Sequence, residues 1–93
     1  MKFEWNEKKA AVNLKKHGVG FDEAATVFGD LLARIFDDNE HSFSEKRNGI
    51  FGRSNRNRLL LVSYAEKESD IIRIISAREA TPRERRNYEN ADE

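Results

Sequence analysis

The chain has 93 residues and no net charge, with 17 basic and 17 acidic side chains, 38% hydrophobic residues and no cysteine. These values predict a single folded domain over residues 1–93, and they exclude disulfide bonds and thiolate metal sites. No apolar run approaches the roughly 18 residues of a membrane span, and the N-terminus lacks the apolar core of a signal peptide. The expected location is therefore the cytoplasm, without a membrane partner.

The first third of the chain predicts two helices. Residues 3–5 are a candidate for a short edge strand. A helix is expected over about 7–17, because Asn6 can cap its first turn and Gly18 can end it. A second helix is expected over about 21–28, where apolar residues recur at helical spacing.

The pattern then becomes extended, with strand candidates separated by polar, turn-forming residues. The candidates span residues 31–36, 46–53, 58–64 and 70–77. A closing helix is expected over 82–90, because Thr81, Pro82 and Glu84 supply a hydroxyl cap, a proline in the first turn and a capping-box glutamate. This order predicts a two-layer α+β domain with two N-terminal helices, a four-stranded antiparallel sheet and a C-terminal helix.

The last strand candidate carries Arg73 among isoleucines and is followed directly by Arg78. An unpaired buried guanidinium is costly, and arginines held near one another on rigid backbone most often bind phosphate or carboxylate. The alternative for Arg73 is a salt bridge across the sheet, for example to Glu45. The alternative for Arg78 is an ion pair with Glu84.

The second and third strand candidates form a basic segment within a neutral chain. Residues 46–64 contain no acid and five basic side chains, which are Lys46, Arg47, Arg53, Arg56 and Arg58. On adjacent strands these would give a local basic face suited to an anionic partner. Alternatively, they serve only to solvate a hairpin.

Several short sequence motifs follow one another along the chain in a specific order and spacing. They are residues 3–6, 13–19 with 21–24, 27–30, 44–47, and 72–78 with 84–88. The most specific are Lys16-His17-Gly18 at a helix end and Ile75-Ser76-Ala77-Arg78 at a strand end. In order and spacing they resemble the BrnT toxins of bacterial type II toxin–antitoxin modules. Gly20 and Asn6 depart from the serine and aspartate that are usual there, which affects helix caps only.

The resemblance implies a RelE-like fold and an endoribonuclease that blocks translation when it is free. It also implies a BrnA-like antitoxin with a ribbon-helix-helix DNA-binding part, which neutralises the toxin and forms with it a repressor of their operon. The implied partners are therefore this antitoxin and an RNA substrate, with or without the ribosome. DNA is contacted only through the antitoxin.

Metal-free RNA cleavage requires a base for the 2′-hydroxyl proton, cations for the phosphorane and an acid for the leaving 5′-oxygen. Its products are a 2′,3′-cyclic phosphate and a 5′-hydroxyl end. The catalytic candidates are Arg47, Arg73 and Arg78 for the phosphate, and His17, Glu45 and Tyr88 for proton transfer. The candidates for further RNA binding are Lys16, Lys46, Arg53 and Arg58.

Several of these residues have simpler explanations. A histidine such as His17 is favoured in the last helical turn by the helix dipole alone, and Tyr88 can pack the closing helix on the sheet. Residues 37–41 contain acidic, Asn and His side chains, but such residues are commoner in turns than in metal sites. Neither a metal nor another cofactor is expected.

Two non-enzymatic functions stay open on the sequence. One is a module that binds RNA or the ribosome through its basic strands without cutting, with salt-dependent affinity and no new RNA ends. The other is a purely structural partner of an acidic protein, which would use the same basic face as an interface.

Overall fold

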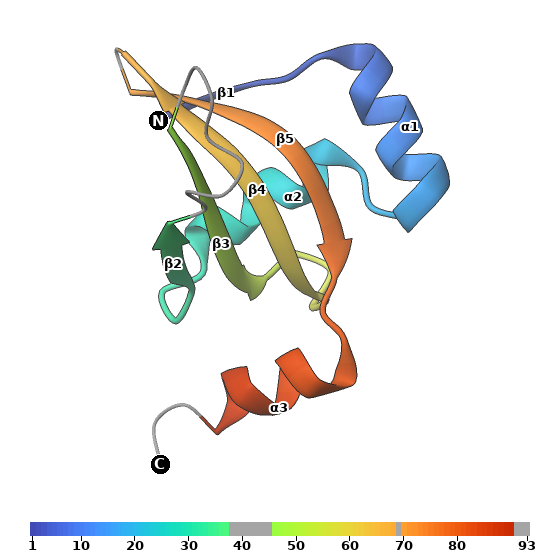
Figure 1. Ribbon diagram of the computed structural model, residues 1–93, viewed down its shortest axis with the longest axis vertical. Coiled ribbons are helices and arrows are strands. Elements are labelled where there is room, and N and C mark those ends of the chain that lie inside the picture. Colours follow the sequence, from blue (N-terminus) through green and yellow to red (C-terminus); the bar gives the residue numbers. More distant parts are fainter. Residues whose placement is uncertain (38–45, 69, 91–93) are drawn as a thin grey trace.

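The computed structural model describes residues 1–37, 46–68 and 70–90, in which one β-sheet is flanked by helices (Figure 1). In chain order the elements are β1 (Lys2–Glu4), α1 (Glu7–His17), α2 (Phe21–Thr26), a 3₁₀ turn η1 (Val27–Gly29), β2 (Arg34–Asp37), β3 (Arg47–Arg53), β4 (Leu59–Lys67), β5 (Ile71–Glu79) and α3 (Pro82–Glu89). The predicted α+β class is confirmed.

The sheet has five strands in the order β1-β5-β4-β3-β2. β1 runs parallel to β5, whereas all other neighbouring strands are antiparallel. The prediction of a four-stranded antiparallel sheet is therefore wrong in strand number and in direction. β1 has only three residues, paired with Ile71–Arg73. A segment this short carries no periodicity of its own, so its pairing depends on a strand far along the chain.

The first two helices lie close to their predicted positions. In α1 the Lys9 N–H donates to Asn6 Oδ1 at 3.0 Å, and Gly18 ends the helix in the left-handed conformation with φ 71°. α2 is shorter than predicted because the chain tightens into the 3₁₀ turn at Val27–Gly29. None of the described helices is long and apolar enough to cross a membrane.

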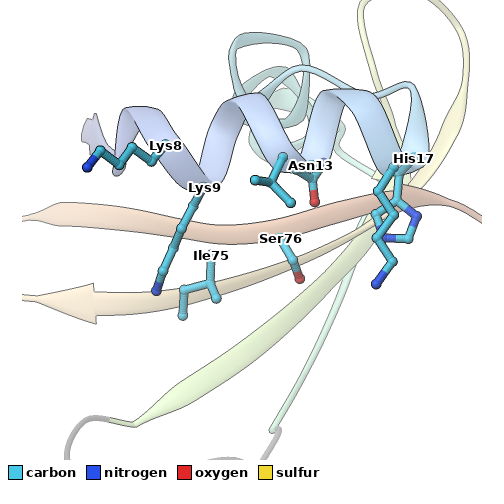
Figure 2. A pocket seen from close by; sticks show the side chains of 8 residues that line it. Lys8, Lys9, Asn13, His17, Ile75 and Ser76 are labelled. Atoms are coloured by element: carbon cyan, nitrogen blue, oxygen red, sulfur yellow. The ribbon is translucent and has the colours of Figure 1, made fainter.

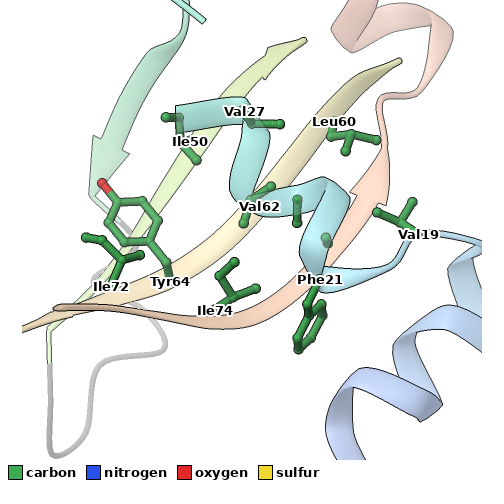
Figure 3. Close-up of a cluster of buried hydrophobic side chains, with 11 residues drawn as sticks. Val19, Phe21, Val27, Ile50, Leu60, Val62, Tyr64, Ile72 and Ile74 are labelled. Carbon is green, nitrogen blue, oxygen red and sulfur yellow. The ribbon is translucent and has the colours of Figure 1, made fainter. Parts of the chain in front are cut away.

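The core lies between α2 and one face of the sheet (Figure 3). Its buried members are Val19, Phe21, Ala24, Val27, Ile50, Leu60, Val62, Tyr64, Ile72, Ile74 and Ala77. Burial of each large apolar side chain contributes roughly 1.5–3 kcal/mol, so this cluster is the main source of stability. It also fixes which strand residues point the other way, because side chains alternate between the faces of a sheet.

α1 lies beside the part of β5 that β1 does not cover. The buried side chain of Asn13 bonds the strand edge, where Nδ2 donates to the Ala77 carbonyl at 2.8 Å and Oδ1 accepts from the Ala77 N–H at 3.1 Å. Asn13 Nδ2 also donates to the carbonyl of Val19 at 2.9 Å. The amide thus takes the place of a neighbouring strand and holds α1 at a fixed position along β5.

α3 packs against the end of the sheet through Tyr88. The Tyr88 ring meets Phe51 edge-on with centroids 5.3 Å apart, and its hydroxyl donates to Asp30 Oδ2 at 3.0 Å. At the start of α3 the predicted capping box between Thr81 and Glu84 is complete. The structure therefore gives Tyr88 the packing role that the sequence offered as its simpler explanation.

Candidate functional site

The face of the sheet turned away from α2 carries three cross-strand rows, and we call it the open face. The rows are Arg47–Ala65–Arg73, Gly49–Ser63–Ser76 and Phe51–Leu61–Arg78. Both outer rows contain arginine, whereas the middle row has only glycine and serine at its β3, β4 and β5 positions. We call the middle row, Gly49–Ser63–Ser76, the floor of the open face, because its small side chains lie between rows that carry arginines.

A β-bulge places both β5 arginines on this face. Arg73 and Arg78 are five residues apart, and in a regular strand an odd spacing puts side chains on opposite faces. Here Ser63 pairs with Ser76 and the next residue, Tyr64, pairs with Ile74, so that the register skips Ile75. Because of this one extra residue, Arg73 and Arg78 lie on the same face of the sheet in spite of their odd spacing. Bulges that redirect side chains in this way are common next to functional sites.

Figure 2 shows the consequence of this bulge, because Ile75 and Ser76 point to the same side of β5. The Arg73 row and the Arg78 row cross β4 at Ala65 and Leu61, four positions apart, which corresponds to about 13 Å. Two long arginine side chains standing at the two ends of this span can both approach an anion on the floor between them. One chemical group suited to such a place is a phosphodiester.

Arg73 is paired with a carboxylate across the sheet. Its Nε donates to Glu4 Oε2 at 2.9 Å, and Lys67 Nζ lies 3.5 Å from the same oxygen. The hydrogen bond from Arg73 is the main reason that the pKa of Glu4 is below its ordinary value. The cross-sheet partner proposed from the sequence, Glu45, lies outside the described residues. A salt bridge was thus foreseen, but Glu4 is the acid that the structure shows.

Arg78 forms the ion pair with Glu84 that the sequence offered as an alternative. Its two terminal nitrogens donate to the two Glu84 oxygens at 2.8 and 3.0 Å. Glu84 Oε1 also accepts the Thr81 N–H at 2.8 Å as part of the capping box. These bonds, the one from Arg78 first, lower the pKa of Glu84 to about 2. The start of α3 therefore orients Arg78 on the open face.

The Arg78–Glu84 pair predicts a pH-dependent contribution to stability. The pKa of Glu84 falls from 4.5 to about 2 on folding, so its contribution is complete above pH 4.5 and disappears as the pH falls towards 2. Glu84→Gln should therefore be less stable than the wild type at pH 7, by an amount that shrinks below pH 4.5. Urea unfolding at several pH values measures this difference.

The matched control is Glu89→Gln, which removes an exposed charge from the same helix. Its difference from the wild type should be small at every pH, because exposed ion pairs contribute little. A Glu84→Gln difference that stays constant from pH 7 to pH 3 would contradict the assignment.

The remaining arginines of the open face differ in their surroundings. Arg47 is half-buried and shares its row with Arg73, about 10 Å away across Ala65. Arg53 lies at the α3 end, where its Nη2 is 3.5 Å from Glu89 Oε1. Lys46 is exposed at the start of β3, 3.7 Å from Asp37. Of these residues, Arg47 and Arg53 lie on the open face, whereas Lys46 precedes β3 and contacts Asp37, which pairs with Asn48 at a core-side position of the strand.

The α1 residues border the open face on the β5 side. A groove of about 340 Å³ separates α1 from β5 and is lined by Lys8, Lys9, Val12, Asn13, Lys16, His17, Ile75 and Ser76. Lys9 and His17 extend past the strand on the side where Ile75 and Ser76 point (Figure 2). A neighbouring cavity of about 470 Å³ contains Lys9 together with Arg73 and Glu4. The structure therefore brings the exposed His17 and Lys16 to the edge of the floor.

Comparison with known proteins identifies the family of the chain. A family model described as the ribonuclease toxin BrnT of type II toxin–antitoxin systems matches residues 5–84. The chain belongs to the BrnT family. A 1.1 Å crystal structure of the Brucella abortus ribonuclease toxin BrnT is similar, with a TM-score of 0.67 and 26% identity over 87% of this chain and 97% of that one. No curated protein gives a match.

In this BrnT-family chain, Arg58 has a structural position. Its side chain donates to Glu23, to Glu79 Oε1 at 2.9 Å and to the Gly18 carbonyl at 3.0 Å. The bonds to Glu23 are the main cause that raises the pKa of Arg58. These contacts tie α2 to the sheet on the core side, so the expected role of Arg58 in RNA binding has no support from its surroundings.

The proton-transfer candidates are separated by the fold. His17 stands beside the floor, whereas Tyr88 is at the α3 end with its hydroxyl bonded to Asp30. Burial is the first cause that raises the pKa of Tyr88, followed by that hydrogen bond. Tyr88 therefore holds its proton at neutral pH. Of these two described candidates, His17 has the better position for chemistry on the floor.

No metal centre is found in the part of the BrnT-family chain that the structure describes, where no group of three or more potential ligands comes together. The acidic stretch 37–41 lies outside the described residues, apart from Asp37.

The sequence did not predict a role for four residues beside the site, which are Ser63, Ser76, Lys9 and Glu4. Lys9 and Lys16 are seven residues apart, two helical turns, which could have indicated a shared face. No comparable signal exists for Ser63 and Ser76, because only the strand register brings them together.

Proposed function

We propose that this protein is an endoribonuclease toxin that cleaves RNA on its open face without a metal ion and thereby blocks translation. The observation that carries the proposal is the bulge at Ile75, which turns Arg73 and Arg78 to the same face as Arg47. Three guanidinium groups around a floor that has serine at its β4 and β5 positions suit a phosphodiester whose negative charge increases in the transition state.

In this proposal the arginines bind the scissile phosphate and stabilise the phosphorane. His17, beside Ser76 at the edge of the floor, exchanges protons with the 2′-hydroxyl or the leaving 5′-oxygen, since imidazole is suited to both directions near neutral pH. Lys9 and Lys16 bind phosphates further along the RNA through the groove next to α1. The products are a 2′,3′-cyclic phosphate and a 5′-hydroxyl end.

The antitoxin of a type II system is the natural inhibitor of such a face. We propose a BrnA-like partner with a ribbon-helix-helix DNA-binding part, which places an acidic or amphipathic segment over the open face and α3. In this arrangement the antitoxin excludes RNA directly, and the toxin contacts operator DNA only through its partner.

The test is to incubate the purified protein with a long single-stranded RNA in the presence of EDTA and to map the new ends. Cleavage that persists in EDTA and gives 5′-hydroxyl and 2′,3′-cyclic phosphate ends is expected. Incorporation of labelled amino acids should also stop within minutes when the chain is produced alone in bacteria. Intact RNA and undiminished protein synthesis with soluble, folded protein would contradict the proposal.

A second function, RNA or ribosome binding without cleavage, is favoured by one observation. Arg73 and Arg78 are both paired with carboxylates, and Tyr88 is bonded to Asp30, so that among the described candidates only His17 is placed for proton transfer. The same experiment separates the two functions. A non-catalytic module would show salt-dependent RNA binding with no new 5′-hydroxyl ends.

A further inference from the structure

An exposed aromatic ring adjoins the floor of the open face. Phe36 on β2 pairs with Gly49 on β3, in the row that continues through Ser63 and Ser76. Phe36 is 45% exposed, although it is a large apolar residue. The ring thus extends the floor row on the side opposite to α1.

Gly49 is what allows the ring to lie so close to the sheet. A Cβ atom at this position would come within 3.0 Å of three atoms at the far end of the Phe36 ring. The ring therefore covers the bare backbone of Gly49, a contact that helps to hold the edge strand β2. This contact alone does not account for the large part of the ring that still faces solvent.

The neighbouring residue Ile35 is also exposed, but it lies on the other face of the sheet. It pairs with Ile50, points to the core side of the sheet and is 65% exposed. Both residues are exposed apolar side chains on the same four-residue strand, but Phe36 alone of the two adjoins the floor and its arginines. The aromatic residue is therefore on the face where RNA is proposed to bind.

We propose that Phe36 stacks against a nucleobase of single-stranded RNA next to the phosphate held on the floor. This inference rests on the proposed ribonuclease function. An unpaired base exposes its π-face, and stacking on an aromatic side chain is tolerant of base identity. Gly49 sets the height of the ring, and the arginines at either side of the floor hold the backbone of the same nucleotide.

The test measures binding of a short 2′-O-methyl oligoribonucleotide, which cannot be cleaved by attack of a 2′-hydroxyl. Phe36→Leu, which keeps an apolar side chain over Gly49, should raise the Kd by about 5- to 100-fold. Phe36→Tyr, which keeps a ring, should bind as the wild type does. The matched control Ile35→Ala should leave the Kd unchanged.

Oligonucleotides with one abasic position at a time identify the stacked base. The wild type should lose affinity most strongly at one position, and Phe36→Leu should lose almost nothing further at that position. The non-additive loss of affinity between the abasic position and Phe36→Leu does not depend on the stability of the fold. It therefore tests the stacking contact even if Phe36→Leu unfolds at a lower temperature. Phe36→Tyr, which keeps the ring, is the reference variant.

Two outcomes would overturn the inference while the proposed function stands. One is RNA cleavage and binding by Phe36→Leu at wild-type levels. The other is unchanged RNA binding together with weaker antitoxin binding, which would make the ring a protein contact. A folded wild type that neither binds nor cleaves RNA would overturn the proposed function itself, and the stacking site with it.

Discussion

Arg73→Ala should lower kcat/KM for RNA cleavage by about 10²–10³-fold, the usual effect of removing one group that stabilises transition-state charge. The effect on stability should be small. The Arg73 side chain is 41% exposed and its partner Glu4 is 39% exposed, and ion pairs of this kind contribute little to folding. Cleavage of a defined RNA and thermal unfolding, measured on the same preparation, test both parts.

Two further variants refine this prediction. Arg73→Lys keeps the charge but not the planar fork, so an intermediate activity is expected if the guanidinium binds two phosphate oxygens. Arg56→Ala is the matched control, because it removes one positive charge from a side chain that is 70% exposed and contacts Glu23 on the core side. Equal activity of the Arg73→Ala and Arg56→Ala variants would exclude Arg73 from the site.

Arg78→Ala is expected to behave differently from Arg73→Ala. Because Glu84 binds Arg78 with both oxygens and also caps α3, removal of Arg78 should lower activity and also loosen α3. In cells, the Arg73→Ala/Arg78→Ala double variant should allow protein synthesis to continue after induction. Arrest by an equally abundant double variant would contradict the arginine site.

The features that the sequence predicted correctly depend on neighbouring residues. Asn6, Gly18 and Thr81 are helix caps whose partners lie within a few positions, and the Arg78–Glu84 pair spans only six residues. Such interactions follow from local geometry, since the chain between the partners is short. They were foreseen for this reason.

The features that were missed depend on the register of distant strands. Arg73 meets Glu4, which is 69 residues away, because β1 joins β5 in parallel. No glycine or proline lies near Ile75 to indicate a bulge in the sequence. The sequence therefore placed Arg73 and Arg78 near one strand end, but it did not predict which face of the sheet each side chain occupies. The candidate site could thus be predicted as a set of arginines, but not as a floor with Ser63 and Ser76 between them.

The buried ion pair on the other side of the sheet leads to the largest expected loss of stability. Glu23 is 6% exposed and accepts hydrogen bonds from Ser54 Oγ at 2.7 Å and from Arg58 Nε at 2.9 Å. The bond from Arg58 is the main cause that lowers the pKa of Glu23. This carboxylate joins α2 to both ends of the turn between β3 and β4.

Glu23→Ala should destabilise the protein by about 3 kcal/mol, since breaking a buried pair leaves the other charge without compensation. This loss is at the lower end of the usual range, because Arg58 is 26% exposed and keeps Glu79 as a partner. For a domain of this size the melting temperature should fall by about 12–24 °C. Chemical and thermal unfolding measure the loss.

Three comparisons test the physical reason for this loss. Arg56→Ala, which removes only the exposed contact to Glu23 at 3.7 Å, should have almost no effect on stability. The Glu23→Ala/Arg58→Ala double variant should be more stable than the sum of the single changes predicts, because neither charge is then left alone.

RNA cleavage per folded molecule should not change in Glu23→Ala, since Glu23 lies on the core side of the sheet. An additive double variant would show that the two side chains stabilise the fold independently, and lost activity in the folded fraction would place Glu23 in the functional site.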